Sequence, residues 1–172
     1  PAPGGMSMAT QTMEPGNYAV VCFIESPDKV PHIAKGMMKP LTVTPVANAN
    51  MTEPTADVTM SLSDYKFALS KPLVAGRQMI KVENVATQPH EVVLVQLDSG
   101  KTIEDVGKWA ADMKGPPPGK PIGGVPGFMP GKNTYFEVNL APGQYGLICF
   151  VPDVKDGKMH YAHGMAQQFT IS

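Results

Sequence analysis

One segment of this 172-residue chain occurs twice, and no other feature of the sequence constrains the fold as strongly. Residues 15–23 (PGNYAVVCF) return as residues 142–150 (PGQYGLICF), with the Pro-Gly, Tyr and Cys-Phe positions identical. After one inserted residue, the match continues through a histidine, a Gly-Met pair and a final apolar segment. Residues 3–43 and 130–171 are therefore two copies of one structural unit.

The two copies differ in what precedes them. Residues 56–129 precede the second copy and are long enough to supply the other half of a domain. The first copy has no such segment before it in this sequence. We therefore expect a complete domain at residues 56–172, a linker at 45–55, and a partial domain, the C-terminal half only, at 1–44.

The partial domain is expected to form three strands, at residues 7–13, 17–24 and 38–44. Three strands with one apolar face do not make a sandwich, because the sheet that would cover this face is missing. We therefore expect the segment to be covered by residues upstream of Pro1, by the second domain or by a different protein.

The composition favours strands and turns in the complete domain, since 17 glycines and 18 prolines are too many for a helical bundle. A single helix is expected at residues 103–113, because Thr102 and Asp105 have the spacing of a capping box. The Gly-Pro-rich residues 115–131 are expected to form a stiff loop. Apolar runs and alternations predict strands at residues 58–62, 80–85, 91–97, 134–140, 144–151 and 166–171. The predicted fold is an all-β, Greek-key β-sandwich with one short inserted helix.

The strand at residues 144–151 is expected to lie at the centre of this sandwich. Successive side chains of a strand point to opposite faces, and this strand is apolar on both. We expect both faces to be buried near Ile148, with Leu94, Val138 and Trp109 in the same core.

Charge and motifs exclude several classes of function. The formal net charge is −1 and gives no electrostatic footprint for nucleic acid. No apolar run reaches the ~18 residues of a transmembrane helix. The sequence lacks the Gly-x-Ser-x-Gly, His-Glu-x-x-His and Cys-x-x-Cys patterns, so we do not expect an enzyme.

Metal-competent residues of the complete domain stand at informative places. His90 precedes a predicted strand, Cys149 lies near the end of another, and His160, His163 and Met165 follow in the next loop. A first histidine followed by Cys, His and Met is the ligand order of a trigonal His₂Cys copper site with a weak axial methionine. The order alone leaves open whether His160 or His163 is the second imidazole.

At these residues the chain resembles the cupredoxins, the plastocyanin and azurin group. The resemblance rests on Pro89-His90, on Pro142-Gly143-x-Tyr145-x-x-x-Cys149 and on His160-x-x-x-x-Met165. It covers residues 53–172 as a whole domain and 1–44 as the C-terminal half of another. It implies that His90, Cys149, His160 and Met165 bind one copper for single-electron transfer, in an extracytoplasmic compartment such as the periplasm.

The chain departs from that family in one loop. The family has about two to four residues between the cysteine and the second histidine, whereas ten residues separate Cys149 from His160 here. The insert at residues 152–158 is polar, and we expect it to be solvated.

A copper-free alternative stays open. Cys149 is equally suited to be a small buried apolar residue, and Met165 to pack beneath the last strand. The first copy keeps Cys22, His32 and Met37 without a counterpart of His90, which favours a structural reason for the motif. In this alternative the protein is a docking module, an extrinsic subunit of a larger membrane-associated complex of electron transfer or photosynthesis.

Overall fold

The computed structural model describes residue 4, residues 6–45 and residues 52–172, and it divides the chain into two compact units. The smaller unit is Thr12–Thr52, and the larger unit combines Pro1–Gln11 with Glu53–Ser172. Within the described residues, no helix is long and apolar enough to span a membrane.

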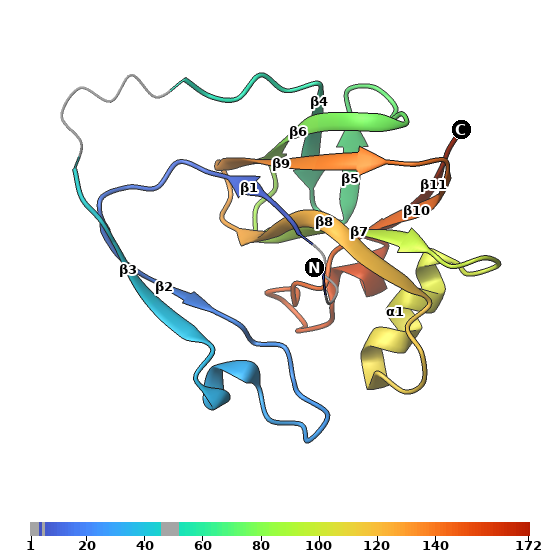
Figure 1. Ribbon diagram of the computed structural model, residues 1–172, viewed down its shortest axis with the longest axis horizontal. Coiled ribbons are helices and arrows are strands. Elements are labelled where there is room, and N and C mark those ends of the chain that lie inside the picture. The colour runs from blue at the N-terminus through green and yellow to red at the C-terminus, as the bar shows by residue number, and fades with distance from the viewer. Residues whose placement is uncertain (1–3, 5, 46–51) are drawn as a thin grey trace. The chain divides into compact units, whose positions relative to one another are not determined.

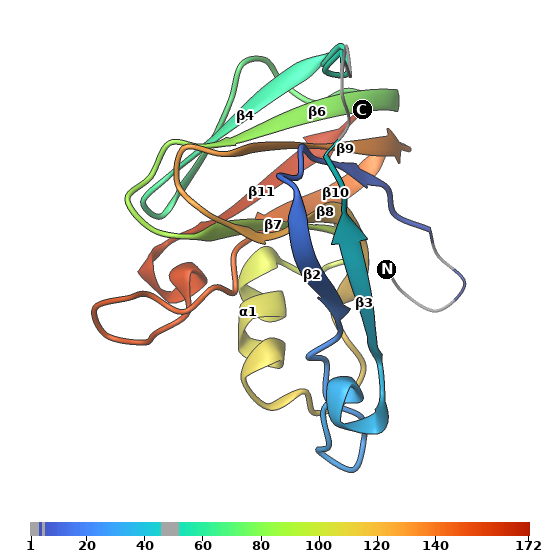
Figure 2. The ribbon, with the colours of Figure 1, turned by 90° about the vertical axis from the view of Figure 1, so that its left-hand side faces the viewer.

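The larger unit is a β-sandwich of two sheets with one α-helix (Figures 1 and 2). One sheet has five strands in the order β1-β9-β6-β4-β5, and the other has four strands in the order β11-β10-β7-β8. The strands are β1 (Ala9–Thr10), β4 (Val58–Ser63), β5 (Lys66–Leu69), β6 (Gly76–Asn84), β7 (His90–Leu97), β8 (Gly119–Phe128), β9 (Asn133–Leu140), β10 (Gly143–Ile148) and β11 (Ala166–Ile171). The predicted all-β sandwich with a short inserted helix is confirmed.

The helix α1 (Ile103–Asp112) begins where its sequence predicts. Thr102 Oγ1 accepts a hydrogen bond from Asp105 N at 3.3 Å, and Asp105 Oδ2 accepts one from Thr102 N at 3.0 Å, so the capping box is complete. The helix ends at Met113, which adopts the left-handed conformation with φ 52°.

The apolar interior has two parts instead of the single core that the sequence predicts. Leu94, Val138 and Leu147 lie between the two sheets, whereas Ile148 packs beneath α1 on the outer face of the four-stranded sheet. Both faces of β10 are buried as expected, because α1 covers the second face. Trp109 belongs to neither cluster of buried residues, and its Nε1 donates to Gly115 O at 3.1 Å. The prediction that Ile148, Leu94, Val138 and Trp109 share one core was therefore wrong. Ile148 faces the layer opposite to that of its strand neighbour Leu147, because successive strand residues point to opposite faces.

The predicted loop at 115–131 was also wrong, since most of it forms strand β8. This strand pairs antiparallel with β7, with register shifts between His90 and Val92 and between Leu94 and Val95. It lies at the edge of its sheet, where prolines are tolerated because the outer side needs no N–H donor. The short strand β5 had no clear apolar pattern and was not predicted.

Truncating Leu147 to alanine is expected to lower the free energy of unfolding by about 2–5 kcal/mol. Leu147 is fully buried between the sheets, so the truncation leaves a cavity. Urea unfolding followed by circular dichroism measures the change. Val154→Ala is the control, because Val154 is exposed and its truncation should stay within about 0.5 kcal/mol. Equal stability of the two variants would contradict the placement of β10.

The smaller unit is a hairpin of β2 (Gly16–Val21) and β3 (Met38–Val43), with the 3₁₀ helix η1 (His32–Lys35) between them. The two strands agree with the predicted segments at 17–24 and 38–44. The predicted strand at 7–13 is reduced to β1, and β1 pairs with β9 of the sandwich. The expected partial domain at 1–44 thus contributes residues to both units, and its separation from 56–172 by a linker stays a prediction. Part of that linker, residues 46–51, lies outside the described residues.

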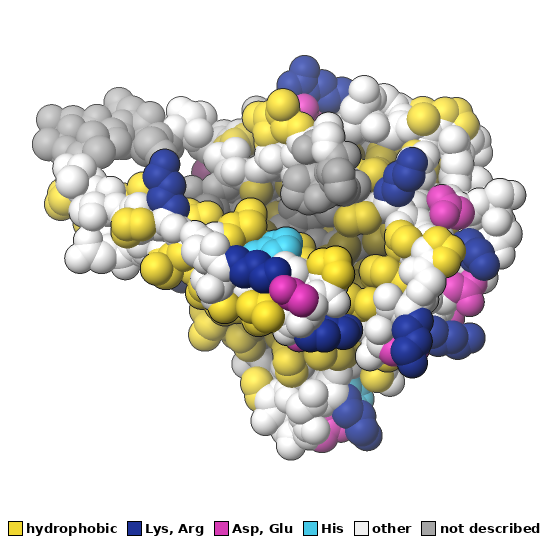
Figure 3. All heavy atoms as spheres, turned by 60° about the horizontal axis from the view of Figure 1, so that its bottom comes forward, with side chains coloured by type: hydrophobic (Ala, Val, Ile, Leu, Met, Phe, Trp, Pro, Cys, Tyr) yellow, Lys and Arg dark blue, Asp and Glu magenta, His cyan; other side chains and the backbone are white. Residues whose placement is uncertain are grey.

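Several apolar side chains of the smaller unit are exposed, and Figure 3 shows hydrophobic side chains gathered at the surface. Phe23 is 71% exposed and Ile24 66% exposed. In the second copy the counterpart of Val20, which is 60% exposed, is Leu147, which is fully buried between the two sheets. The hairpin therefore keeps, on exposed side chains, an apolar pattern that is buried in the second copy.

Candidate metal centre

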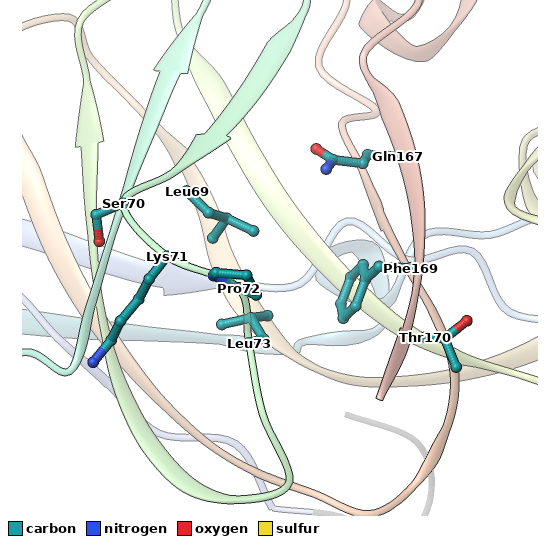
Figure 4. A pocket seen from close by; sticks show the side chains of 8 residues that line it. All are labelled: Leu69, Ser70, Lys71, Pro72, Leu73, Gln167, Phe169 and Thr170. Atoms are coloured by element: carbon teal, nitrogen blue, oxygen red, sulfur yellow. The ribbon is translucent and has the colours of Figure 1, made fainter. Parts of the chain in front are cut away.

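Three side chains with metal-binding atoms meet at one end of the sandwich. His90 begins β7, Cys149 follows β10, and His160 begins the 3₁₀ helix η2 (His160–His163). All three are fully buried. The hollow between the segment after β5 and β11 lies elsewhere, and neither histidine nor cysteine lines it (Figure 4).

The distances between the donor atoms suit a single metal ion. Cys149 Sγ lies 3.9 Å from His90 Nδ1 and 3.4 Å from His160 Nδ1, and the donor atoms of all three residues lie within 4.8 Å of one another. Thiolate and imidazole donors about 2.0–2.3 Å from a trigonal ion lie about 3.5–4.0 Å apart. The donor set and its spacing therefore fit copper with little movement of the backbone.

The backbone explains how His160 reaches Cys149 across ten intervening residues. Pro152 and Met159 form a β-bridge that closes the insert at its base. Beyond the bridge, His160 N donates to Val151 O at 2.9 Å. The insert is thus a loop that is closed at its base, and its length does not change the position of His160.

We expected the insert to be solvated, and this prediction was wrong for part of it. Asp153 is only 4% exposed, whereas its neighbour Val154 is exposed. The carboxylate of Asp153 accepts hydrogen bonds from Tyr65 OH at 2.5 Å and from Gln88 Nε2 at 2.9 Å. These bonds, the Tyr65 bond first, hold the pKa of Asp153 well below its usual range. The polar insert therefore supplies a buried carboxylate beside the site.

Each candidate imidazole has a carboxylate near its second ring nitrogen. His90 Nε2 lies 3.3 Å from Asp64 Oδ1, and His160 Nε2 lies 3.8 Å from Asp153 Oδ2. Metal-binding histidines commonly have such partners, which fix the ring and its tautomer. Protons on the two Nε2 atoms would leave both Nδ1 lone pairs directed toward the Cys149 side of the cluster.

Burial favours the neutral form of both imidazoles, which is the form that binds a metal. Burial lowers the pKa of His90, although Asp64 acts in the opposite direction. Burial also lowers the pKa of His160, and the nearby His90 adds to this effect. A neutral imidazole has a free lone pair, so both rings are ready to bind a metal at neutral pH.

The thiol of Cys149 is held in its protonated form when no metal is bound. Burial raises its pKa to about 11, while Glu91 N donates a weak hydrogen bond to Sγ at 3.5 Å. Glu91 is fixed in turn, since its Oε1 accepts from Phe150 N at 2.8 Å. A metal must therefore displace the thiol proton, which makes binding dependent on pH.

Met165 and His163, which the sequence also singled out, have different surroundings. Met165 is fully buried, and its carbonyl accepts a hydrogen bond from Cys149 N at 3.2 Å. His163 is partly exposed, and its Nε2 lies 3.1 Å from Asp156 Oδ1. The structure thus brings His160 and the Met165 backbone to Cys149 and directs His163 to a carboxylate of the insert. The roles of Asp64 and Asp153 had no signal in the sequence.

The charge of Asp153 is expected to stabilise the metal-free fold above about pH 4. Its folded-state pKa is depressed, so this stabilisation is present above the unfolded pKa and is lost as the pH falls toward the folded value. Asp153→Asn keeps the shape and removes the charge. Urea unfolding should show wild type more stable than Asp153→Asn at pH 7, with a smaller difference at pH 3. A difference that grows on acidification would contradict the hydrogen-bonded carboxylate.

Comparison with known proteins finds neither a matching family model nor a matching curated sequence. Solved structures do match, and two of them are auracyanins. The dithionite-reduced auracyanin of the photosynthetic bacterium Roseiflexus castenholzii is 22% identical, with a TM-score of 0.46 over 66% of this chain and 94% of that one. Auracyanin B is 19% identical, with a TM-score of 0.45 over 72% of this chain and 95% of that one.

A multi-copper oxidase from Pediococcus acidilactici is 16% identical, with a TM-score of 0.34 over 77% of this chain and 30% of that one. The β-sandwich expected from the sequence is seen in the two sheets themselves, and the auracyanins are among the solved structures to which this chain is similar.

Proposed function

We propose that this protein binds one copper at His90, Cys149 and His160, with Met165 as a further, weaker ligand, and transfers single electrons. The observation that carries the proposal is the meeting of three metal-binding side chains, all fully buried, within 4.8 Å. Buried polar side chains are normally paired, because desolvation is costly. Among the described residues, His160 Nε2 is a buried nitrogen without a hydrogen bond; it lies 3.8 Å from Asp153 Oδ2, and the ring faces Cys149 through Nδ1 instead.

When bound, copper supplies a one-electron couple, and the protein supplies a rigid set of donors. Cys149 is fixed by backbone bonds to Met165 and Tyr161, at 3.2 Å and 3.0 Å. His90 is fixed at Nε2 by Asp64. Donors held in this way change position little between oxidation states, which favours electron transfer over chemistry on a substrate.

An extracytoplasmic location and a role outside enzyme catalysis belong to the same proposal. They follow from the resemblance to small cupredoxins and not from a separate feature of this chain. A periplasmic fraction enriched in the native protein would support the location.

Copper titration tests the proposal. The metal-free chain is loaded with Cu(II), and bound copper is measured by elemental analysis and visible absorption. We expect one equivalent of Cu(II) with an intense thiolate-to-copper band, and neither in Cys149→Ser. A folded wild-type chain that gives no such band would overturn the proposal.

A second candidate function is the copper-free docking module, and the exposed hairpin favours it. Val20 on β2, and Phe23 and Ile24 just after it, are exposed apolar side chains of the hairpin. An apolar sheet of another protein, such as a subunit of a membrane-associated complex, would bury them. Hydrogen exchange of the hairpin tests the docking role. Slow exchange of β2 and β3 in the isolated monomeric chain argues against a docking role, and protection that appears only within an assembly supports it.

A further inference from the structure

The smaller unit reproduces the backbone that surrounds the metal centre of the larger unit. Cys22 N donates to Met37 O at 3.2 Å, and Cys149 N donates to Met165 O at the same distance of 3.2 Å. The tyrosine four residues before each cysteine is also fixed in the same way. Tyr18 OH donates to the carbonyl of residue 14 at 2.7 Å, as Tyr145 OH does to the carbonyl of residue 141 at 2.8 Å.

The turn that carries the histidine is likewise repeated. Met37 N donates to His32 O at 2.9 Å, and Met165 N donates to His160 O at 3.0 Å. Each turn is a four-residue 3₁₀ helix that begins at the histidine and ends at a glycine with positive φ, 91° in one copy and 100° in the other. A bridge closes each preceding loop at its base.

The side-chain donors come together as they do in the larger unit. Cys22 Sγ lies 3.5 Å from His32 Nδ1, and Cys149 Sγ lies 3.4 Å from His160 Nδ1. The first copy therefore contains a preformed Cys-His pair beside a methionine, in the arrangement of the metal centre.

Two differences set the chemistry of this second cluster. His32 is the only histidine of the sequence before His90, so no second imidazole accompanies Cys22 within the hairpin. The cluster is also open, since Met37 is 57% exposed and lines a hollow together with Cys22. Thiolate, thioether and a single imidazole form a soft set of three donors, which selects Cu(I) over Cu(II).

We infer that Cys22, His32 and Met37 form a second metal site, which takes Cu(I). On binding, the Cys22 thiol loses its proton to water and a copper–sulfur bond forms, without a change in oxidation state. The inference rests on the hairpin alone and does not require copper at Cys149.

Anaerobic Cu(I) titration of the full chain against a competing chelator tests the inference. The background is Cys149→Ser, which disables the first centre. We expect this chain to bind one Cu(I), and the Cys22→Ser/Cys149→Ser chain to bind none. His32→Gln and Met37→Leu, each in the Cys149→Ser background, should weaken binding at least tenfold, in the range found for lost metal-site interactions.

Met129→Leu is the control, because Met129 is an exposed methionine of the larger unit and does not line the hollow that Cys22 and Met37 share. Its Cu(I) affinity should equal that of the parent chain. Unchanged affinity in His32→Gln and Met37→Leu would mean binding by a free thiol only, and it would overturn the site. The visible Cu(II) band of Cys22→Ser reports on the first centre alone, so a failure of the proposed function would appear separately.

Discussion

Replacement of Gly124 by alanine is expected to cost more than about 4 kcal/mol of unfolding free energy or to prevent folding. Gly124 has φ +125°, which L side chains rarely adopt. A Cβ atom built there lies 1.9 Å from Val92 O and 2.8 Å from Val92 C. Val92 belongs to β7, which is paired on both sides, so its backbone has little freedom to move away.

Gly127→Ala is the matched control on the same strand. Its Cβ would meet Val151 Cγ2 at 3.4 Å, which is an ordinary contact, and its φ is not in the left-handed region. We expect a change within about 1 kcal/mol. Urea unfolding followed by circular dichroism compares both variants with wild type. Equal stability of the Gly124 and Gly127 variants would show that β8 does not approach β7 as closely as described.

The same strand shows where prediction from sequence failed. Gly and Pro at residues 115–131 are typical of a loop when the segment is considered alone. In the structure the glycines of β8 permit close approach to β7, and its prolines are tolerated at a sheet edge. Both reasons depend on a neighbour that is distant in the sequence. The strands with continuous apolar patterns, such as β7 and β10, needed no such information.

Only part of the candidate site was predictable, again because some of its contacts depend on residues that are distant in the sequence. The order of His90, Cys149 and His160 along the chain indicated a metal centre, because ligand type and order are properties of the sequence. The inward turn of Asp153 was not predictable, since it depends on hydrogen bonds from Tyr65 and Gln88, 88 and 65 residues away. The internal repeat predicted the two strands of the hairpin, but it did not indicate how exposed their side chains are.

The sequence left open which of His160 and His163 completes the centre, and a pair of substitutions is expected to separate them. His160→Gln should abolish the thiolate-to-copper band, because His160 Nδ1 lies 3.4 Å from Cys149 Sγ. His163→Gln should retain the band, because His163 lies beside Asp156 and its ring packs against Tyr65, with ring centroids 4.9 Å apart. Both variants are loaded with one equivalent of Cu(II), and the visible and electron paramagnetic resonance spectra are compared.

Glutamine is chosen because it keeps a polar side chain of similar length while removing the imidazole donor. Circular dichroism before loading confirms that each variant is folded, so that a missing band reports on the ligand and not on the sandwich. A His163→Gln chain without the band, beside a His160→Gln chain that keeps it, would assign the second imidazole to His163. The insert would then have to open at the bridge between Pro152 and Met159 on metal binding, because that bridge holds η2 with His160 facing Cys149.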